Sequence, residues 1–293
     1  MGNRRLLTST VCGLLGALTL TGCAAIRSHT SAKAKPDPLA QPREFHALRF
    51  APDKVPRIDG DFADWASVPE SCWITTADMR HDWKKDRLKD VLRVCIGYCA
   101  ETARLYFAVD VDDNYLKADQ YRSPSADPYY PFIDDIFEVV VDADRSGDDF
   151  VYFKKSLTPE ENRRLCGCHA QNYHIYLVTP PETEHAWLWG DQKWLLGKPY
   201  AEWAHQVEGK PGGPARIRLE FYITPFNYAS PDGPEGSARA VLTPGSKIGI
   251  GWLRLDDEFP DKTGRKLGDC YFFGSKLELY KDADDCYDVT MDP

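Results

Sequence analysis

The chain has 293 residues, of which 43% are hydrophobic, so its apolar side chains are numerous enough to build a sizeable core. Its 45 acidic and 36 basic residues give a formal net charge of −9, which argues against a nucleic-acid partner because nucleic-acid binding needs a basic patch. No internal repeat is visible, and we expect one large domain after an N-terminal leader.

The first residues have the layout of a bacterial export signal. Arg4 and Arg5 precede an apolar stretch from Leu6 to Leu20, which is shorter than the roughly 20 apolar residues that span a bilayer. The stretch ends in Leu20-Thr21-Gly22-Cys23, which resembles the lipobox of bacterial lipoproteins, where the cysteine is diacylated and becomes the new N-terminus. We therefore expect a signal peptide over residues 1–22 and a lipid anchor such as palmitate on Cys23, which would hold the protein at a membrane. The alternative is an ordinary signal peptide in which Cys23 is incidental.

The segment that begins with the cysteine predicts a tether. Residues 23–44 are rich in alanine, serine, lysine and proline and contain few large apolar side chains, a composition typical of flexible linkers. Ala24 stands where an aspartate would indicate retention at an inner membrane, so we expect a lipid-anchored protein of the bacterial cell envelope, at the outer membrane or the cell surface. The folded domain is expected over residues 45–293.

Cysteine usage fits an exported domain. Seven cysteines remain when Cys12 leaves with the signal and Cys23 takes lipid. Export favours disulfides, so we expect disulfides with at least one thiol left over, in a connectivity that the sequence leaves open. Cys166-Gly167-Cys168-His169 has the residue types of a zinc site, but no second Cys or His pair follows at the spacing that a zinc finger needs. Paired or simply buried cysteines are the better expectation.

Alternating apolar and polar residues predict strands through most of the domain. In residues 104–111 the side chains of Leu105, Phe107, Val109 and Val111 share one face, which is the period of two that marks a strand. The same period predicts strands over residues 135–142, 172–179, 215–224, 247–255 and 271–280.

Helical signals are few. A short helix is expected over residues 159–165, with Thr158 as its N-cap and Pro159 in its first position. Many strands and few helices predict an all-β protein, an antiparallel β-sandwich with two sheets in a jelly-roll or immunoglobulin-like arrangement.

Five segments, taken in order, resemble the family 9 carbohydrate-binding modules and the wider group of DOMON-like sandwich domains around them. They are Arg57 to Trp65, with an Ile-Asp-Gly turn before a tryptophan; Arg104 to Asp113; Asp134 to Asp142, in which Asp-x-x-Glu enters an apolar strand; Leu219 to Phe226; and Ile248 to Trp252. The resemblance implies the sandwich fold and sugar binding without catalysis. Trp65 and Trp252 are expected to pack in the core, and Asp59 to hydrogen-bond its own turn.

The resemblance also implies where a sugar would bind. Relatives hold the end of a sugar between two aromatic rings, and the matching positions here are Phe132 and Phe272. Sugar-binding relatives have tryptophan at these positions, so stacking on phenylalanine is weaker. The alternative is that both rings fold onto the core.

Three polar positions complete the binding set that the resemblance implies: Glu138, His174 and Tyr176. His174 and Tyr176 alternate on one predicted strand and therefore share a face. Relatives have arginine and asparagine at the positions of these two residues, which is a departure from the family pattern. Alternatively, Glu138 is solvated or forms an ion pair with Arg218.

A run of tryptophans follows the predicted strand over residues 172–179. Trp187, Trp189, Trp194 and Trp203 crowd one region, which is dense for a surface loop. They build either a second aromatic platform or a cover over the open end of the sandwich.

An acidic turn has the spacing of a calcium loop. Asp142, Asp144 and Asp148 stand at ligand-like intervals with Gly147 in the sixth place, but Phe153 occupies the twelfth place, where a bidentate glutamate is usual. We expect a structural Ca²⁺ at these aspartates, with a solvated acidic turn as the alternative. No organic cofactor is expected.

The sequence therefore predicts a non-catalytic, carbohydrate-binding lipoprotein. A structural envelope lipoprotein that uses the same sandwich for protein contacts is the main alternative. A haem-binding redox domain is less expected, because only Met79 and Met291 remain as methionine ligands and Cys-x-x-Cys-His is absent. An acid and base pair of Glu138 and Glu220 would need a short separation that the sequence does not show, and no Gly-x-Ser-x-Gly elbow is present.

Overall fold

The computed structural model describes residues 44–82, 91–117, 134–178, 186–256 and 269–293. The expected signal peptide, the lipidated Cys23, nearly all of the tether and Phe132 lie outside the described residues. Within them, no helix is long and apolar enough to cross a membrane. The described part is mostly β structure, which confirms the predicted all-β class.

The strands are β1 (Phe45–Arg49), β2 (Ile74–Thr75), β3 (Arg80–Asp82), β4 (Val91–Cys99), β5 (Arg104–Asp113), β6 (Ile136–Asp142), β7 (Gln171–Tyr176), β8 (Ala186–Leu188), β9 (Ala201–Gly209), β10 (Ala215–Ile223), β11 (Phe226–Tyr228), β12 (Ala238–Arg239), β13 (Lys247–Asp256), β14 (Asp269–Phe273) and β15 (Tyr287–Met291). The helix α1 (Pro159–Leu165) has the predicted bounds, with Thr158 and Glu161 forming a capping box. Short 3₁₀ turns are η1 (Phe62–Trp65), η2 (Glu70–Cys72), η3 (Thr76–Asp78), η4 (Lys193–Leu195), η5 (Pro234–Gly236), η6 (Leu277–Tyr280) and η7 (Ala283–Asp285).

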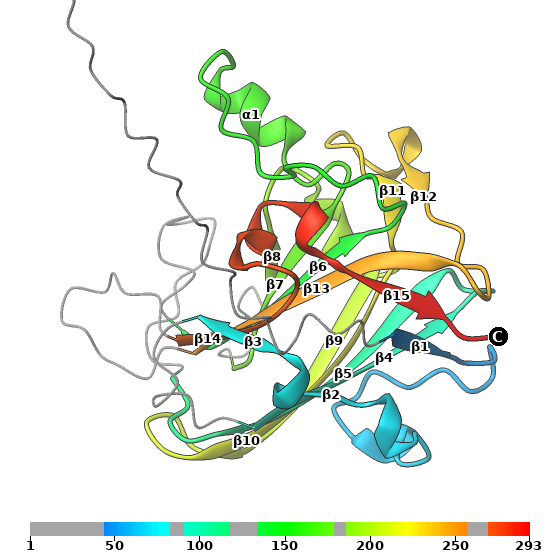
Figure 1. The fold of residues 1–293 in the computed structure, drawn as a ribbon, viewed down its shortest axis with the longest axis vertical. Coiled ribbons are helices and arrows are strands. Elements are labelled where there is room, and N and C mark those ends of the chain that lie inside the picture. Colours follow the sequence, from blue (N-terminus) through cyan, green and yellow to red (C-terminus); the bar gives the residue numbers. More distant parts are fainter. Residues whose placement is uncertain (1–43, 83–90, 118–133, 179–185, 257–268) are drawn as a thin grey trace, which may run out of the picture. The chain divides into compact units, whose positions relative to one another are not determined.

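Two layers of strands enclose the core (Figure 1). Sheet A has the order β8-β7-β6-β13-β15, with β14 and β3 continuing beyond β13, and sheet B has the order β4-β5-β10-β9, with β2 beside β4. β1 links the sheets, because it pairs in parallel with β15 through its first residues and with β4 through its last two. The other pairings between these strands are antiparallel, so the predicted antiparallel sandwich is confirmed, with β1 as the exception.

Alternate residues of the long strands fill the core, as their period of two predicts. Phe107 of β5 stacks on Phe221 of β10, with ring centroids 4.6 Å apart and planes at 8°. Phe137 of β6 meets Phe221 at 6.1 Å and so joins the two sheets. Trp252 is fully buried and stacks on Phe273, which confirms its expected place in the core. Met79 and Met291 are part of the same core.

One strand is shorter than its alternation predicts. The period of two continues to Tyr280, but β14 ends at Phe273 and the chain turns at Gly274 into η6. Leu279 of η6 packs so tightly that a Cβ atom on Gly251 of β13 would lie 2.5 Å from it. The apolar residues after Phe273 therefore cover β13 from outside the sheet.

The outer face of sheet B receives the N-terminal segment of the domain. Glu220 of β10 accepts hydrogen bonds from the backbone N–H groups of Asp59 and Gly60 and from Nε1 of Trp65, at 2.7 to 3.0 Å. Trp65 is 2% exposed, as expected, and Oδ1 of Asp59 accepts from the backbone of Asp61, which confirms the predicted turn. One carboxylate thus fixes the whole Ile-Asp-Gly-to-tryptophan motif.

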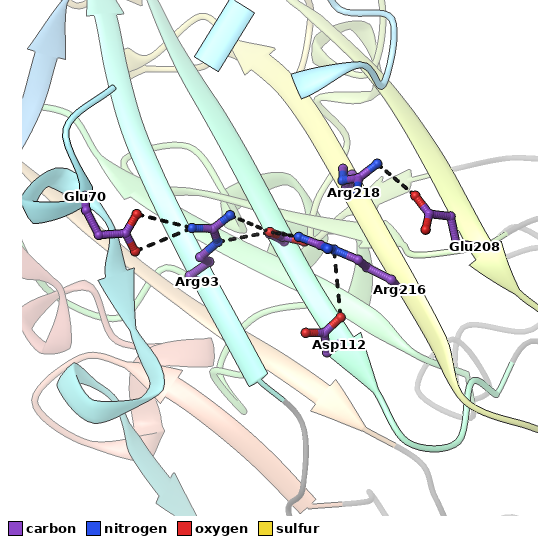
Figure 2. A network of polar contacts seen from close by, with 7 residues as sticks. Glu70, Arg93, Asp112, Glu208, Arg216 and Arg218 are labelled. Atoms are coloured by element: carbon purple, nitrogen blue, oxygen red, sulfur yellow. Dashed lines mark hydrogen bonds and ion pairs between the residues drawn. The ribbon is translucent and has the colours of Figure 1, made fainter. Parts of the chain in front are cut away.

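Farther along the same face, alternating charges cross the sheet (Figure 2). Asp110 of β5 accepts from Arg93 of β4 at 3.0 Å and from Arg216 of β10 at 2.9 Å. Burial raises the pKa of Asp110, but these two arginines outweigh it and hold that pKa below its usual value. Arg218 pairs with Glu208 of β9 at 2.9 Å, so the suggested ion pair between Arg218 and Glu138 is wrong. The charged side chains on this part of the outer face of sheet B therefore pair with one another.

A buried cation joins the ends of strands from both sheets. The guanidinium of Arg254 on β13 lies 3.0 Å from Asp113 at the end of β5, 3.4 Å from Asp135 just before β6, and 3.9 Å from Asp256. All four side chains are at most 1% exposed. One carboxylate oxygen of each aspartate lies within 4.8 Å of those of the other two. The guanidinium of Arg254 supplies the positive charge that offsets their repulsion.

We predict that Arg254→Met lowers the free energy of unfolding by about 3–5 kcal/mol, because it leaves buried aspartates uncompensated. Arg218→Met is the matched control, since it removes an arginine from a more exposed ion pair and should cost about 0–1 kcal/mol. Urea unfolding followed by tryptophan fluorescence measures both. Equal losses in the two variants would contradict the role of Arg254.

Candidate functional site

The outer face of sheet A carries the polar residues that the sequence singles out. Glu138 on β6 lies opposite His174 on β7, and Tyr176 follows two residues later on the same face. Phe272 of β14 belongs to the same buried cluster as Tyr176. The structure therefore brings these four predicted residues to one face, while Phe132, the other half of the expected clamp, lies outside the described residues.

Glu138 and His174 form a dry, uncharged contact. Nδ2 of Asn172 donates to Oε1 of Glu138 at 2.6 Å, and Nε2 of His174 lies 3.5 Å from the same oxygen. Burial raises the pKa of Glu138 to about 8, although the hydrogen bond from Asn172 opposes the rise, and burial lowers the pKa of His174 to about 3. Both groups are therefore mainly neutral at pH 7.

Trp187 covers this contact. β8 pairs with β7 so that Trp187 stands beside His174, and the two rings stack with centroids 3.6 Å apart and planes at 9°. Trp189 meets the edge of Trp187 at 5.0 Å and 82°. Glu138 and His174 are each about 1% exposed, so they support Trp187 and do not line an open cleft.

A pocket of about 590 Å³ lies on the far side of this stack. Trp187, Trp189 and Tyr152 supply its aromatic lining, and Phe153 stands at its edge with 76% of its surface exposed. The pocket has two walls. One is β8 and the chain that follows it, and the other is the long connection from β6 to β7, which includes α1. An open hollow with several aromatic side chains is the usual form of a small-ligand site.

Local hydrogen bonds fix both walls of the pocket. Asn162 of α1 accepts from the backbone N–H of Lys154 at 2.8 Å and donates to its carbonyl at 3.0 Å. On the other wall, Gln192 donates to the carbonyl of Cys166 at 3.0 Å. Gly190 has φ +95°, and a Cβ atom there would lie 2.3 Å from that carbonyl, so glycine permits this close approach. Both walls are preorganised.

The four tryptophans of the crowded region take different places. Trp187 and Trp189 line the pocket, whereas Trp194 packs on Tyr200 and Phe226 and donates to the carbonyl of Ser230. Trp203, on β9, packs against the main core. The region therefore provides an aromatic surface from its first two tryptophans and packing from the last two.

Among the described residues, Cys72, Cys95, Cys99, Cys166, Cys168 and Cys286 are free thiols, so the expected disulfides are not seen there. Cys95 and Cys99 are buried on β4, where their spacing along one strand prevents a bond between them. Burial raises the pKa of Cys168 to about 11 and also raises that of Cys166, so both side chains are neutral thiols at pH 7. The alternative of simply buried cysteines fits this region.

The acidic turn after β6 uses its oxygens locally. Asp142 accepts from the backbone N–H groups of Ser146 at 3.2 Å and Gly147 at 2.9 Å, and Asp144 accepts from Ser146 at 3.1 Å. Asp148 has a positive φ of 74° within the turn. These contacts are those of a self-capped acidic turn, and calcium at Asp142, Asp144 and Asp148 stays a prediction.

The two glutamates considered as an acid and base pair lie apart in the fold. Glu138 belongs to β6 of sheet A and contacts Asn172 and His174. Glu220 belongs to β10 of sheet B and is occupied by the Trp65 motif. Neither carboxylate lines the pocket.

Comparison with solved structures identifies the fold. A family 9 carbohydrate-binding module from Caldicellulosiruptor kristjanssonii in complex with cellotriose has 12% sequence identity and a TM-score of 0.53, over 85% of this chain and 94% of that one. A module of the same family and organism in complex with glucose has 10% identity and a TM-score of 0.48, over 85% and 95% of the two chains. No protein-family model and no curated protein matches the sequence. The chain thus has the fold of a family 9 carbohydrate-binding module, as its five motifs predict.

We predict that Glu138→Gln removes a pH dependence of stability. Burial raises the pKa of Glu138 from its ordinary value of 4.5 to about 8 in the folded protein, so its contribution to stability is fully present below pH 4.5 and is lost as the pH rises through 8. Glutamine keeps an acceptor for Asn172 and cannot ionise. Relative to the variant, the wild type should lose on the order of a few kcal/mol between pH 5 and 9.

Denaturant unfolding at several pH values measures the difference in the free energy of unfolding between the wild type and Glu138→Gln. The other titratable groups are present in both proteins, so their effects cancel in this difference. His174, whose pKa is lowered, affects the acid side in both. A difference between the two proteins that does not change with pH would contradict the buried, neutral state of Glu138.

Proposed function

We propose that this protein binds carbohydrate without transforming it, and that the sugar lies in the pocket against Trp187 and Trp189. The observation that carries the proposal is this tryptophan-lined pocket on a fold shared with a carbohydrate-binding module solved with cellotriose. A sugar ring has an apolar C–H face that packs on aromatic rings and a rim of hydroxyls that polar groups can bind. The pocket offers both kinds of surface.

The aromatic side chains suit an extended ligand. Phe153 is exposed and Trp189 is partly exposed, whereas Trp187 is held flat on His174 and is only 9% exposed. Because the stack fixes Trp187 before any ligand arrives, little conformational entropy is lost there on binding. The pocket volume of about 590 Å³ leaves room for a short oligosaccharide.

The clamp that the family resemblance implies, between Phe132 and Phe272, is the alternative place for the sugar. Phe272 is 6% exposed and packs in the cluster with Tyr176, which disfavours its use as an open platform. Glu138, His174 and Tyr176 are similarly covered. We therefore assign them to the support of the pocket, and keep Phe132 as a test of the alternative.

We predict that Phe153→Ala and Trp189→Ala each weaken sugar binding about fivefold or more, because an aromatic contact contributes on the order of 1 kcal/mol beyond its buried area. Isothermal titration with a panel of neutral and acidic oligosaccharides measures the dissociation constant, which for one small sugar should be near 1 mM, or about −4 kcal/mol. Tyr280→Ala is the matched control, since Tyr280 is an exposed aromatic residue that does not line the pocket.

Two outcomes would change the conclusion. Binding that survives both pocket variants but is lost in Phe132→Ala would move the sugar to the clamp. Failure of every sugar in the panel to bind would refute the function and favour a structural envelope protein.

We further propose that the domain is held at the bacterial cell envelope by lipid on Cys23, after removal of residues 1–22. The support is the sequence Leu20-Thr21-Gly22-Cys23 at the end of a short apolar stretch. We expect labelled palmitate to be incorporated into the wild type and not into Cys23→Ser, as measured on the full chain expressed in bacteria. Equal labelling of both proteins would contradict lipidation at this residue.

A further inference from the structure

The charge of the pocket differs from that of the chain. The chain has 45 acidic and 36 basic residues. Of the described residues that line the pocket, four are basic and none is aspartate or glutamate. The basic residues are Lys154, Lys155, Arg163 and Lys193.

In the described part of the chain, no ion pair joins Lys154, Lys155 or Lys193 to an acidic residue. Asp191 is engaged by Arg163 at 2.7 Å, and Asp232 by Arg164 at 2.7 Å. Glu161 caps α1 through Thr158. These three acids are held by partners outside the lysine group, so in the described part of the chain they form no ion pair with Lys154, Lys155 or Lys193.

The lysines are positioned against the aromatic lining. Nζ of Lys154 lies 4.9 Å from the ring centroid of Tyr152, and the backbone of Lys154 is held by Asn162. Lys193 begins η4, which follows the loop that Gln192 ties to Cys166. Basic groups therefore come from both walls of the pocket, around rings that suit a sugar face.

We propose that the pocket selects acidic oligosaccharides, whose rings pack on the indoles while carboxylate groups meet Lys154, Lys155 and Lys193. This inference rests on the proposed function and names its ligand class. A neutral sugar uses only the aromatic and hydrogen-bonding contacts. An acidic one adds charge-assisted hydrogen bonds, which are the stronger kind.

The test compares two trisaccharides with the same ring and linkage that differ at C6: cellotriose, with hydroxymethyl groups, and the β-1,4-linked trisaccharide of glucuronic acid, with carboxylates. Isothermal titration into the lipid-free domain at low salt should show the glucuronic acid trisaccharide binding about tenfold more tightly. Raising the ionic strength to 0.5 M should remove most of this preference, because screening weakens exposed charge contacts.

A charge-matched pair of variants assigns the preference to the pocket. Replacing Lys154, Lys155 and Lys193 by glutamine should abolish the preference, so that the two trisaccharides then bind with dissociation constants within about twofold of each other. The control replaces Lys54, Lys210 and Lys247, exposed lysines that do not line the pocket, and should keep the preference.

The outcomes separate the two proposals. Equal binding of both trisaccharides, or an equal loss of preference in the two triple variants, would overturn the selection of acidic sugars and leave carbohydrate binding intact. Binding of neither trisaccharide, nor of any sugar in the wider panel, would refute carbohydrate binding and this inference with it. Tight binding of the acidic trisaccharide that depends on the three pocket lysines supports both.

Discussion

The buried ion cluster around Arg254 is the constraint on which the described fold depends most. Charged groups removed from water cost several kcal/mol each unless they are paired. Asp113 and Asp135 therefore have to meet Arg254, and they mark the end of β5 in sheet B and the start of β6 in sheet A. This requirement fixes two strand ends from different sheets against β13. The register of β6 on β13, which places Glu138 beside Leu253, begins at the same point.

From that register follows the support of the pocket. β7 pairs with β6 and β8 with β7, so Glu138, His174 and Trp187 lie side by side across three strands. Burial makes the first two neutral, and a neutral imidazole is a suitable flat surface for the indole that stacks on it. Glu138 and His174, which the family resemblance assigns to the rim of a sugar, thus hold the ring of Trp187 in place at the wall of the pocket.

The two outer faces of the sandwich use charge differently. On sheet B, arginines and acids neutralise one another across β4, β5, β10 and β9 (Figure 2). Beside sheet A, the long connection from β6 to β7 and the segment after β8 bring four basic residues to a pocket whose described lining contains no aspartate or glutamate. The second arrangement therefore presents basic groups to a ligand. Selectivity for acidic sugars would then come from the connections, on a fold whose sheets supply rigidity.

The sequence by itself determined the sandwich class, the helix α1 and six of the strands, namely β5, β6, β7, β10, β13 and β14, because a period of two, an N-cap threonine and a proline in the first turn are local signals. It also placed Glu138, His174 and Tyr176 on one face, since alternation along a strand fixes direction. It gave a wrong end to β14, because Leu279 packs on Gly251 from outside the sheet, which alternation does not encode. The pocket was decided only by the tertiary structure. Trp187 reaches His174 through strand pairing, and Lys154 and Lys193 meet around one hollow although they are far apart in the chain. Local patterns define which way a side chain points, and packing between distant segments decides what it meets.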